Sequence, residues 1–195
     1  GELTVPSDRG VLLEETWRMH PDVCSFISEV MYGGKLRSHS TCAVQSVAGQ
    51  TGLRWLRAVH KGCSTESPEE AAIVVATVEE LLGQPWTDQH RGARPLTVAD
   101  FMVVAPYNDQ RRCVEAALRA NPATRGVEVG TVDKFQGREA AVVMFSMATS
   151  SSEFMPRAAD FLFSKNRLNV AISRARCLAY LMCTDELLDT RARDV

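Results

Sequence analysis

The sequence lacks a long apolar run, since no stretch of its 195 residues approaches the roughly 18 apolar residues that cross a bilayer. Residues 1–10, GELTVPSDRG, also lack the basic-then-apolar order of a secretory signal. We therefore expect no membrane segment and a cytoplasmic protein. The length and the 45% apolar content fit a single domain, residues 1–195, with one sizeable core.

Six cysteines are present, but they form no C-x-x-C pair and have no histidine at metal-ligand spacing. This pattern supports neither a zinc site nor a disulfide framework, and we expect no metal site. Cys24, Cys113, Cys177 and Cys183 lie among apolar neighbours, which is typical of buried thiols. His20 has no cluster of ligands around it, so we interpret it as a structural or helix-capping residue.

A phosphate loop of the form G-x-x-x-x-G-K-[ST] is also absent, and no expected strand ends in the acidic pair that holds Mg²⁺. The parts that bind most of a nucleoside triphosphate and its metal are therefore missing. The net charge of -2 excludes a global polyanion-binding composition. The charge is uneven, however: residues 66–88 hold six acids and no base, whereas residues 157–176 hold five bases and one acid, which predicts a local basic surface.

Strand-like apolar runs alternate with helical patterns through most of the chain. This alternation is typical of an α/β fold of three layers, in which helices cover both faces of a mostly parallel sheet. The expected strands are residues 53–59, 101–105, 127–132, 141–147 and 177–183. Residues 36–52, 84–96 and 148–160 are expected to form loops.

One helix is marked by signals at both of its ends. Ser67 is in position to be its N-cap, Pro68 occupies the first helical position, and Glu70 is spaced to complete a capping box. Gly83 stands just past the last turn.

Two further helices are indicated by their end signals. In one, Asn108 is placed to cap the first turn and the helix ends before Pro122. The other begins at Pro21 and ends at Gly33 and Gly34.

Residues 166–176, NRLNVAISRAR, carry three arginines and no acid on a helical pattern. At 100° per residue, one face holds Leu168, Ala171, Ile172 and Ala175. The opposite half is polar and includes Arg174. The pattern predicts a helix that packs on one side and presents guanidinium groups to an anion on the other.

A polar turn, residues 131–139, follows an expected strand. Ligands of doubly wound sheets bind beyond the carboxyl ends of the strands, so we expect this turn at the binding edge. Gly137 would let the backbone approach a ligand, Thr131 can donate to a phosphate, and Glu139 can accept from a ribose hydroxyl. The alternative is an ordinary connection with solvated charges.

Trp17 and Arg18 stand side by side just before the helix that begins at Pro21. The tryptophan is suited to stack on a base, and the arginine to pair with a phosphate. For an isolated pair, the favoured alternative is a half-buried tryptophan beside a surface arginine.

Four segments together carry a resemblance to a known family: TWRMHP, VVAPYNDQ, VGTVDKFQGREAAVV and NRLNVAISRAR. Their order and spacing resemble the later motifs of superfamily 1 helicases. The closest group contains the nonsense-mediated-decay RNA helicase and the replication helicase-nuclease. The resemblance covers residues 11 to 183 and identifies the chain with the second, C-terminal RecA-like domain of such a motor.

The resemblance implies a role for each matching position. Arg18 and Arg174 would act in catalysis by reaching the γ-phosphate of ATP across the boundary between two domains. Trp17 would lie against the adenine. The sugar and phosphates would be bordered by Gln136, Gly137 and Glu139, and the single strand by Pro106, Tyr107, Asn108 and Thr131.

One departure from the family pattern concerns the adenine contact. The family usually has Gln-Tyr before the Arg-Met-His-Pro run, whereas Thr16 and Trp17 stand there in this chain. Stacking on a base is preserved, but the hydrogen bonds of a tyrosine hydroxyl and a glutamine amide are not.

The resemblance also implies a cofactor and partners. The cofactor is ATP with Mg²⁺, and the metal would be held by an N-terminal RecA-like domain that this sequence does not contain. That domain would be one partner, and single-stranded nucleic acid the other, with DNA expected over RNA. The leading hypothesis is the second motor domain of an ATP-dependent helicase or translocase, inactive as an isolated chain.

Two alternatives remain open at this point. The chain could be a non-catalytic nucleic-acid-binding module that has kept the fold without its ATPase partner, although such a module has no need of Arg18 and Arg174. It could also be the motor part of a helicase-nuclease fusion. The sequence shows no clustered carboxylates spaced for metal-dependent cleavage, so any nuclease would lie outside these residues.

Overall fold

The fold is built around one parallel sheet, seen in a computed structural model that describes residues 13–156 and 165–189. Its strands lie in the order β4-β10-β9-β7-β8, and each neighbouring pair is parallel. They are β4 (Gly52–Arg57), β7 (Phe101–Val104), β8 (Glu128–Gly130), β9 (Ala140–Ser146) and β10 (Ala175–Cys183). Each strand of this sheet corresponds to one that the sequence predicts.

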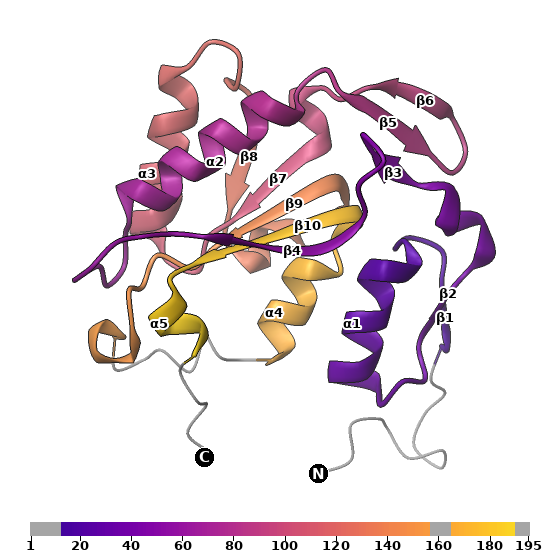
Figure 1. The fold of residues 1–195 in the computed structure, drawn as a ribbon, viewed down its shortest axis with the longest axis horizontal. Helices are drawn as coiled ribbons and strands as arrows, with labels where there is room; N and C mark the ends of the chain where they lie inside the picture. Colours follow the sequence, from indigo (N-terminus) through magenta and orange to yellow (C-terminus); the bar gives the residue numbers. More distant parts are fainter. Residues whose placement is uncertain (1–12, 157–164, 190–195) are drawn as a thin grey trace.

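Helices cover both faces of the sheet, which confirms the expected three-layer, RecA-like α/β fold (Figure 1). One face is covered by α2 (Pro68–Leu81) and α3 (Asn108–Ala120), and the other by α1 (Pro21–Tyr32) and α4 (Lys165–Ile172). Val142 and Met144 of β9 enter the core under α2 and α3, whereas Val143 and Phe145 enter the other core. Burial on both faces explains why this strand reads as a continuous apolar run.

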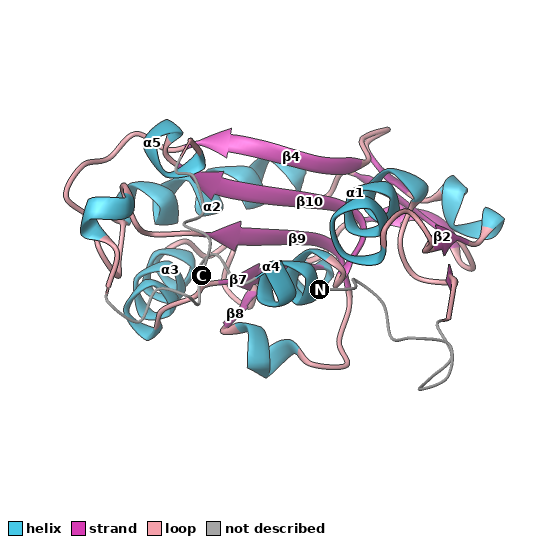
Figure 2. Cartoon of the chain, turned by 90° about the horizontal axis from the view of Figure 1, so that it is seen from below, coloured by secondary structure: helices cyan, strands magenta, loops and turns pink. Residues whose placement is uncertain are grey.

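All five strands run in the same direction, so their amino ends lie along one edge of the sheet and their carboxyl ends along the opposite edge (Figure 2). We name these the amino edge and the carboxyl edge. A short helix, α5 (Asp185–Leu188), follows β10 at the carboxyl edge. Across the described parts of the chain, no helix combines the length and apolar character needed to span a membrane.

The expected ends of α2 are confirmed, but the prediction of a capping box at its start is wrong. Ser67 is the N-cap, since its side chain accepts a hydrogen bond from the backbone N–H of Glu70 at 3.1 Å. The Glu70 carboxylate does not return to the cap. It is fully buried, and the Ser67 N–H donates instead to Oε1 of Gln110 at 2.6 Å. Gly83 follows the helix with a φ of +80°.

The ends of α1 agree with the sequence, and those of α3 agree in part. His20 caps α1, because its Nδ1 accepts from the Asp22 N–H at 3.1 Å, and Gly33 ends the helix in the left-handed conformation. Asn108 does not cap α3. It is the first residue of that helix, and the N-cap is Tyr107, which makes no side-chain capping bond. The helix ends at Ala120, before Pro122 as expected.

Two of the segments expected to be loops contain strands. Residues 36–52 hold β2 (Arg37–Ser38), the 3-10 helix η1 (Ser40–Val44) and β3 (Ser46–Val47), and residues 84–96 hold β5 (Pro85–Asp88) and β6 (Gly92–Pro95). β3, β5 and β6 form a small antiparallel sheet, and β2 pairs with β1 (Glu15–Thr16). Strands of two to four residues are too short to show the two-residue period of a half-buried strand.

The remaining short elements connect the main ones. They are the 3-10 helices η2 (Val98–Asp100), η3 (Val132–Phe135) and η4 (Ser152–Phe154). The last lies in the third expected loop, of which residues 157–160 fall outside the described residues. Cys24, Cys177 and Cys183 are buried free thiols as expected, whereas Cys113 is partly exposed.

Candidate functional site

The arginine segment is helical over a shorter range than the sequence predicts. α4 ends at Ile172, and Ala175 already belongs to β10, where it pairs with Ala140 of β9. Ala171, Ile172 and Ala175 are buried, so the prediction of a packed face is correct although the helix is too long. Pairing with the sheet ends the helix, and Arg174 therefore lies in the turn between α4 and β10.

Arg174 is held at the amino edge by backbone carbonyl groups. Its Nε donates to the carbonyl of Val170 at 3.1 Å, and its Nη1 to that of Arg138 at 3.5 Å. Burial lowers the pKa of the Arg174 guanidinium, and the positive charge of Arg18 lowers it further, while Glu139 acts in the opposite direction. Two guanidinium groups therefore approach one another, which favours an anion between them.

Arg18 reaches the same edge from the loop between β1 and α1. Its Nε donates to Oε2 of Glu139 at 2.6 Å, and its Nη1 to the carbonyl of Ser173 at 3.3 Å. Its own carbonyl accepts from Nε2 of the fully buried Gln45 at 2.8 Å. The residue is thus fixed through both its backbone and its side chain, yet a third of the side chain, 33%, is exposed.

Arg176 ties this group to the small sheet. Its Nη1 lies 2.7 Å from Oδ2 of Asp88, at the end of β5, and its Nε lies 3.8 Å from Oε1 of Glu139. Burial acts to raise the pKa of Asp88, but hydrogen bonds from the backbone of His90 and Arg91, together with Arg176, outweigh it and lower the pKa. Arg176 is therefore a largely buried residue that supports the group, with 13% of its side chain exposed. We name Arg18, Asp88, Glu139, Arg174 and Arg176 the arginine cluster.

The arginine cluster lies at the amino edge of the sheet, not at the carboxyl edge where the turn 131–139 was expected. Thr131 does follow β8 at the carboxyl edge, but η3 carries the chain back, and Glu139 immediately precedes β9. Arg138 pairs with Glu128, the first residue of β8, at 2.5 Å. The second half of the turn thus lies at the opposite end of the strands.

The other residues expected to border the nucleotide lie on the same turn. Gln136 and Gly137 are both exposed, between the buried Phe135 and the paired Arg138. Gly137 has a φ of +80°, which side chains with a Cβ rarely adopt. The glycine is therefore required by the backbone of the turn, and its open surroundings leave room for a close approach.

Trp17 presents its ring to solvent, with 56% of the residue exposed. The indole stacks on the imidazole of His39, with ring centroids 3.5 Å apart and an angle of 15° between the planes. Trp17 thus keeps more than half of its surface in solvent, and the neighbouring Arg18 is paired with Glu139.

The residues expected to face a single strand lie at the carboxyl edge. The ends of β7 and β8 are adjacent there, since the Ala105 N–H donates to the carbonyl of Gly130 at 3.0 Å. This contact brings together the loops of Tyr107 and Thr131, which are both half-buried, while Asn108 is exposed and Pro106 is buried. Burial raises the pKa of the Tyr107 hydroxyl, whose oxygen has almost no exposed surface, so the ring of Tyr107 is the part that a strand could contact.

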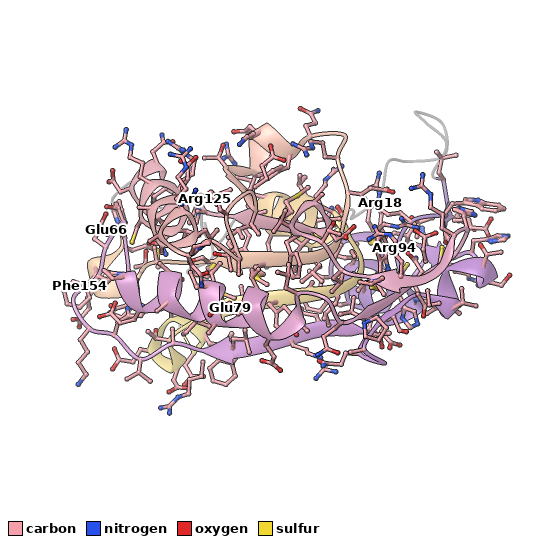
Figure 3. The ribbon with its side chains drawn as sticks, turned by 90° about the horizontal axis from the view of Figure 1, so that it is seen from above. Arg18, Glu66, Glu79, Arg94, Arg125 and Phe154 are labelled. Atoms are coloured by element: carbon pink, nitrogen blue, oxygen red, sulfur yellow. The ribbon has the colours of Figure 1, made fainter. Side chains whose placement is uncertain are left out.

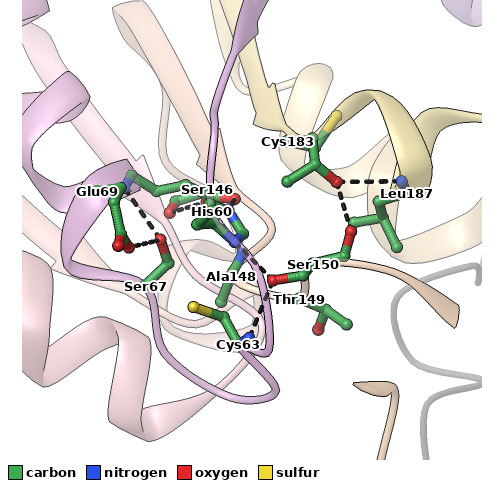
Figure 4. A network of polar contacts seen from close by, with 12 residues as sticks. His60, Cys63, Ser67, Glu69, Ser146, Ala148, Thr149, Ser150, Cys183 and Leu187 are labelled. Carbon is green, nitrogen blue, oxygen red and sulfur yellow. Dashed lines mark hydrogen bonds and ion pairs between the residues drawn. The ribbon is translucent and has the colours of Figure 1, made fainter. Parts of the chain in front are cut away.

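A buried polar group at the same edge was not predicted from the sequence (Figure 4). Glu70 accepts from Nε2 of His60 at 3.0 Å on one oxygen, and from the Ser146 hydroxyl at 2.6 Å on the other. His60 contacts the Ser150 hydroxyl at 2.8 Å, and Gln110 donates to Ser146 at 2.8 Å. We name these five residues the carboxyl-edge network.

Figure 3 places the two polar groups at opposite ends of the molecule. Arg18 and Arg94 are at one end, and Glu66, next to the N-cap of α2, is at the other. The amino end combines paired but partly exposed guanidinium groups with an exposed aromatic ring, which suits a ligand made of phosphates and a base. In the described residues, no group of three or more His, Cys, Asp or Glu side chains is arranged to hold a metal ion.

Comparison with known proteins gives a family and relatives. A family model described as AAA domain matches residues 3–186. An uncharacterized ATP-dependent helicase of Caenorhabditis elegans is 29% identical over 182 residues, which cover 84% of this chain and 11% of that protein. DNA-binding protein SMUBP-2 of Mesocricetus auratus is 26% identical over 200 residues, covering 93% of this chain and 19% of that protein. The chain thus spans a small part of the length of these relatives.

One solved structure completes the comparison. The C-terminal domain of a possible DNA helicase from Lactobacillus plantarum is 12% identical, with a TM-score of 0.49, over 88% of this chain and 89% of that one.

Proposed function

The chain belongs to the AAA domain family. We propose that it is the C-terminal RecA-like domain of a superfamily 1 helicase, and that it supplies two phosphate-sensing arginines to an ATP site shared with a second domain. The observation that carries this proposal is the convergence of Arg18 and Arg174. They come from loops far apart in the sequence, and both reach the amino edge beside Glu139. Guanidinium groups placed in this way stabilise charge on a phosphoryl group in transfer.

The rest of the nucleotide would lie along the same edge. Trp17 offers an exposed ring for the adenine, and Gln136 and Gly137 offer exposed backbone and amide groups for the sugar and phosphates. Glu139 is paired with Arg18 in this structure, so its contact with a ribose hydroxyl requires Arg18 to move towards the phosphates. Mg²⁺ would be held by the N-terminal RecA-like domain, and it neutralises phosphate charge when bound.

The nucleic-acid strand would contact the carboxyl edge through Pro106, Tyr107, Asn108 and Thr131. An aromatic ring and a hydroxyl at adjacent strand ends suit the stacking of a base and contact with the backbone. We expect single-stranded DNA to be bound in preference to RNA. ATP-driven closure of the two domains would then move the strand, as a helicase or a translocase does.

The test is ATP turnover by the protein that carries this chain together with its ATP-binding domain, measured with single-stranded DNA and RNA side by side. Turnover stimulated by a strand, and stronger with DNA, is the expected result. The isolated chain should hydrolyse ATP no faster than buffer, because it lacks the phosphate loop and the magnesium ligands. Strand-stimulated turnover by the isolated chain would contradict the proposal.

A further inference from the structure

His39 and Trp17 are brought side by side by the pairing of two very short strands. β1 and β2 are parallel, with Thr16 opposite Ser38, so the next residue of each strand leaves the pair at the same point. The His39 N–H donates to the carbonyl of Thr16 at 2.8 Å, which fixes the register at this position. The stacking of the two rings is therefore set by the backbone.

The His39 ring and the Trp17 backbone are also held from outside the pair. Nδ1 of His39 accepts from the N–H of Thr41 at 3.3 Å and lies 2.8 Å from the Thr41 hydroxyl, so the imidazole caps η1. On the other side, Nε2 of Gln89 in the β5–β6 turn donates to the carbonyl of Trp17 at 2.9 Å. The imidazole lies flat against one face of the indole, while more than half of Trp17, 56%, stays exposed.

We propose that His39 is a positioning residue that covers one face of Trp17 and so leaves a single face for the adenine ring of a nucleotide. The inference rests on the proposed function, because it assigns the base to the site whose phosphates meet the arginine cluster. An indole that is free on both faces can rotate about its side-chain bonds. It loses the entropy of this rotation when a base stacks on it, which weakens binding. The imidazole removes this freedom before the ligand arrives.

The stack also accounts for a tryptophan at a position where the family usually has tyrosine. A tyrosine can be oriented by a hydrogen bond of its hydroxyl group, whereas an indole ring has no hydroxyl and only its N–H as a donor. A flat partner ring at 3.5 Å provides orientation by a different route. The larger indole surface suits the two-ring system of a purine.

The test is an NMR titration of the chain itself. The sequence has three tryptophans, so the indole N–H signals are few, and loss of one signal in Trp17→Phe assigns it to Trp17. ADP, tripolyphosphate and a short oligodeoxyadenylate are titrated separately, since a base can come from a free nucleotide or from a strand. We expect ADP to shift the Trp17 signal and tripolyphosphate to leave it nearly unchanged.

Substitutions at His39 then test its role. His39→Ala should raise the Kd for ADP about fivefold, as expected for weakened aromatic stacking, and should leave the Kd for tripolyphosphate unchanged. His39→Phe should restore ADP affinity, because phenylalanine keeps a flat aromatic ring at this position although it lacks the imidazole nitrogens. Thr41→Ala is the matched control, because it removes a partner of the imidazole but keeps both stacked rings, and should bind ADP as the parent chain does.

Four results would overturn the inference. They are no ADP-induced shift at Trp17 in the parent chain, unchanged ADP affinity in His39→Ala, increased affinity in that variant, and a Trp17 response confined to oligodeoxyadenylate. Increased affinity would mean that the imidazole occupies the place of the base. Failure of the proposed function looks different: tripolyphosphate would not bind, while ADP would still shift Trp17 and His39→Ala would still weaken that response.

Discussion

The arginine cluster and the carboxyl-edge network both gather polar side chains from distant segments, but they differ in how completely those groups are paired. In the network, the side chains of His60 and Glu70 have no exposed surface, and both carboxylate oxygens of Glu70 accept hydrogen bonds. In the cluster, Arg18 and Glu139 are 33% and 44% exposed. The cluster also holds three guanidinium groups and two carboxylates.

We interpret this difference as one between a structural group and the ligand-binding group that we propose. A buried polar network must pair all of its members, because an unpaired group inside the protein is costly. An excess of partly exposed guanidinium groups can be solvated by water. These groups form their strongest hydrogen bonds when an anion binds to them. The network should therefore control the stability of the domain, and the cluster its ligand binding.

The largest expected effect is on catalysis at the amino edge. In the protein that contains both motor domains, Arg174→Ala should lower ATP turnover about a thousandfold, as for other arginines that stabilise a transferring phosphoryl group. The side chain lies at the surface of a turn anchored by buried neighbours, so the fold should be kept. Steady-state ATPase and strand affinity without nucleotide are measured on one preparation.

The control for this substitution is Arg125→Ala, which removes an exposed guanidinium far from the cluster and should leave turnover unchanged. Unchanged turnover in Arg174→Ala would contradict its assigned role. Lost strand affinity with normal basal hydrolysis would instead assign Arg174 to strand binding.

The next effect concerns stability at the carboxyl edge. Glu70→Ala should lower the free energy of unfolding of the chain by about 3 kcal/mol, because His60 and Ser146 would lose their buried partner. Urea denaturation measures this change. Glu80→Ala, which removes an exposed carboxylate near the other end of the same helix, should change stability by about 0.5 kcal/mol or less. Equal losses in the two variants would show that the network is not a stabilising unit.

A third effect tests whether the carboxyl edge also binds the strand. Replacing both Tyr107 and Thr131 with alanine should weaken binding of a labelled single strand about tenfold, because a stacking ring and a hydroxyl contact are removed. Binding by the isolated chain should already be weak and sensitive to salt, because in our proposal the second domain would supply the other half of the channel. Trp55→Phe, which changes an exposed aromatic residue on the distant strand β4, is the control. Equal affinity in the double variant would mean that the strand contacts another surface.

The smallest expected effect is a gain of anion binding at the amino edge. Glu139→Gln should strengthen binding of tripolyphosphate about threefold, because Arg18 loses a partly exposed carboxylate that competes with the anion. Isothermal titration of the chain measures the change, with Glu80→Gln, on the exposed side of α2, as the control for loss of one acid. Weaker binding in Glu139→Gln would show that the carboxylate is needed to orient Arg18 for its ligand.

The central sheet could be predicted from the sequence, but the small sheet could not. β7, β9 and β10 are buried on both faces, so each reads as an apolar run with clear ends. β3, β5 and β6 have no such pattern, and Gln45 and Asp88 were missed because they lie in this region. Their roles depend on contacts across the fold, such as that of Gln45 with Arg18.

The candidate site also divides into features that the sequence predicts and features that depend on distant contacts. Resemblance to a family identified Arg18, Glu139 and Arg174, but not the partners that they have in this structure. The Arg18–Glu139 pair joins residues 121 positions apart, a contact that no local pattern reports. The same holds for Glu70, whose spacing predicts a capping box but whose carboxylate turns inward because His60 and Ser146 satisfy it better.

The arginine cluster also ties the binding site to the folding reaction. Its members come from the loop before α1, the end of β5, the start of β9 and the start of β10, so the site is complete only after the last strand has joined the sheet. Contacts between such distant segments close large loops. They form late in folding because the chain loses entropy before the new contacts contribute favourable energy. A nascent chain whose β10 has not yet left the ribosome carries Arg18 and Glu139 but lacks Arg176, so the phosphate site that we propose is still incomplete. The nucleotide affinity that we propose would therefore be absent from a partly folded or truncated chain.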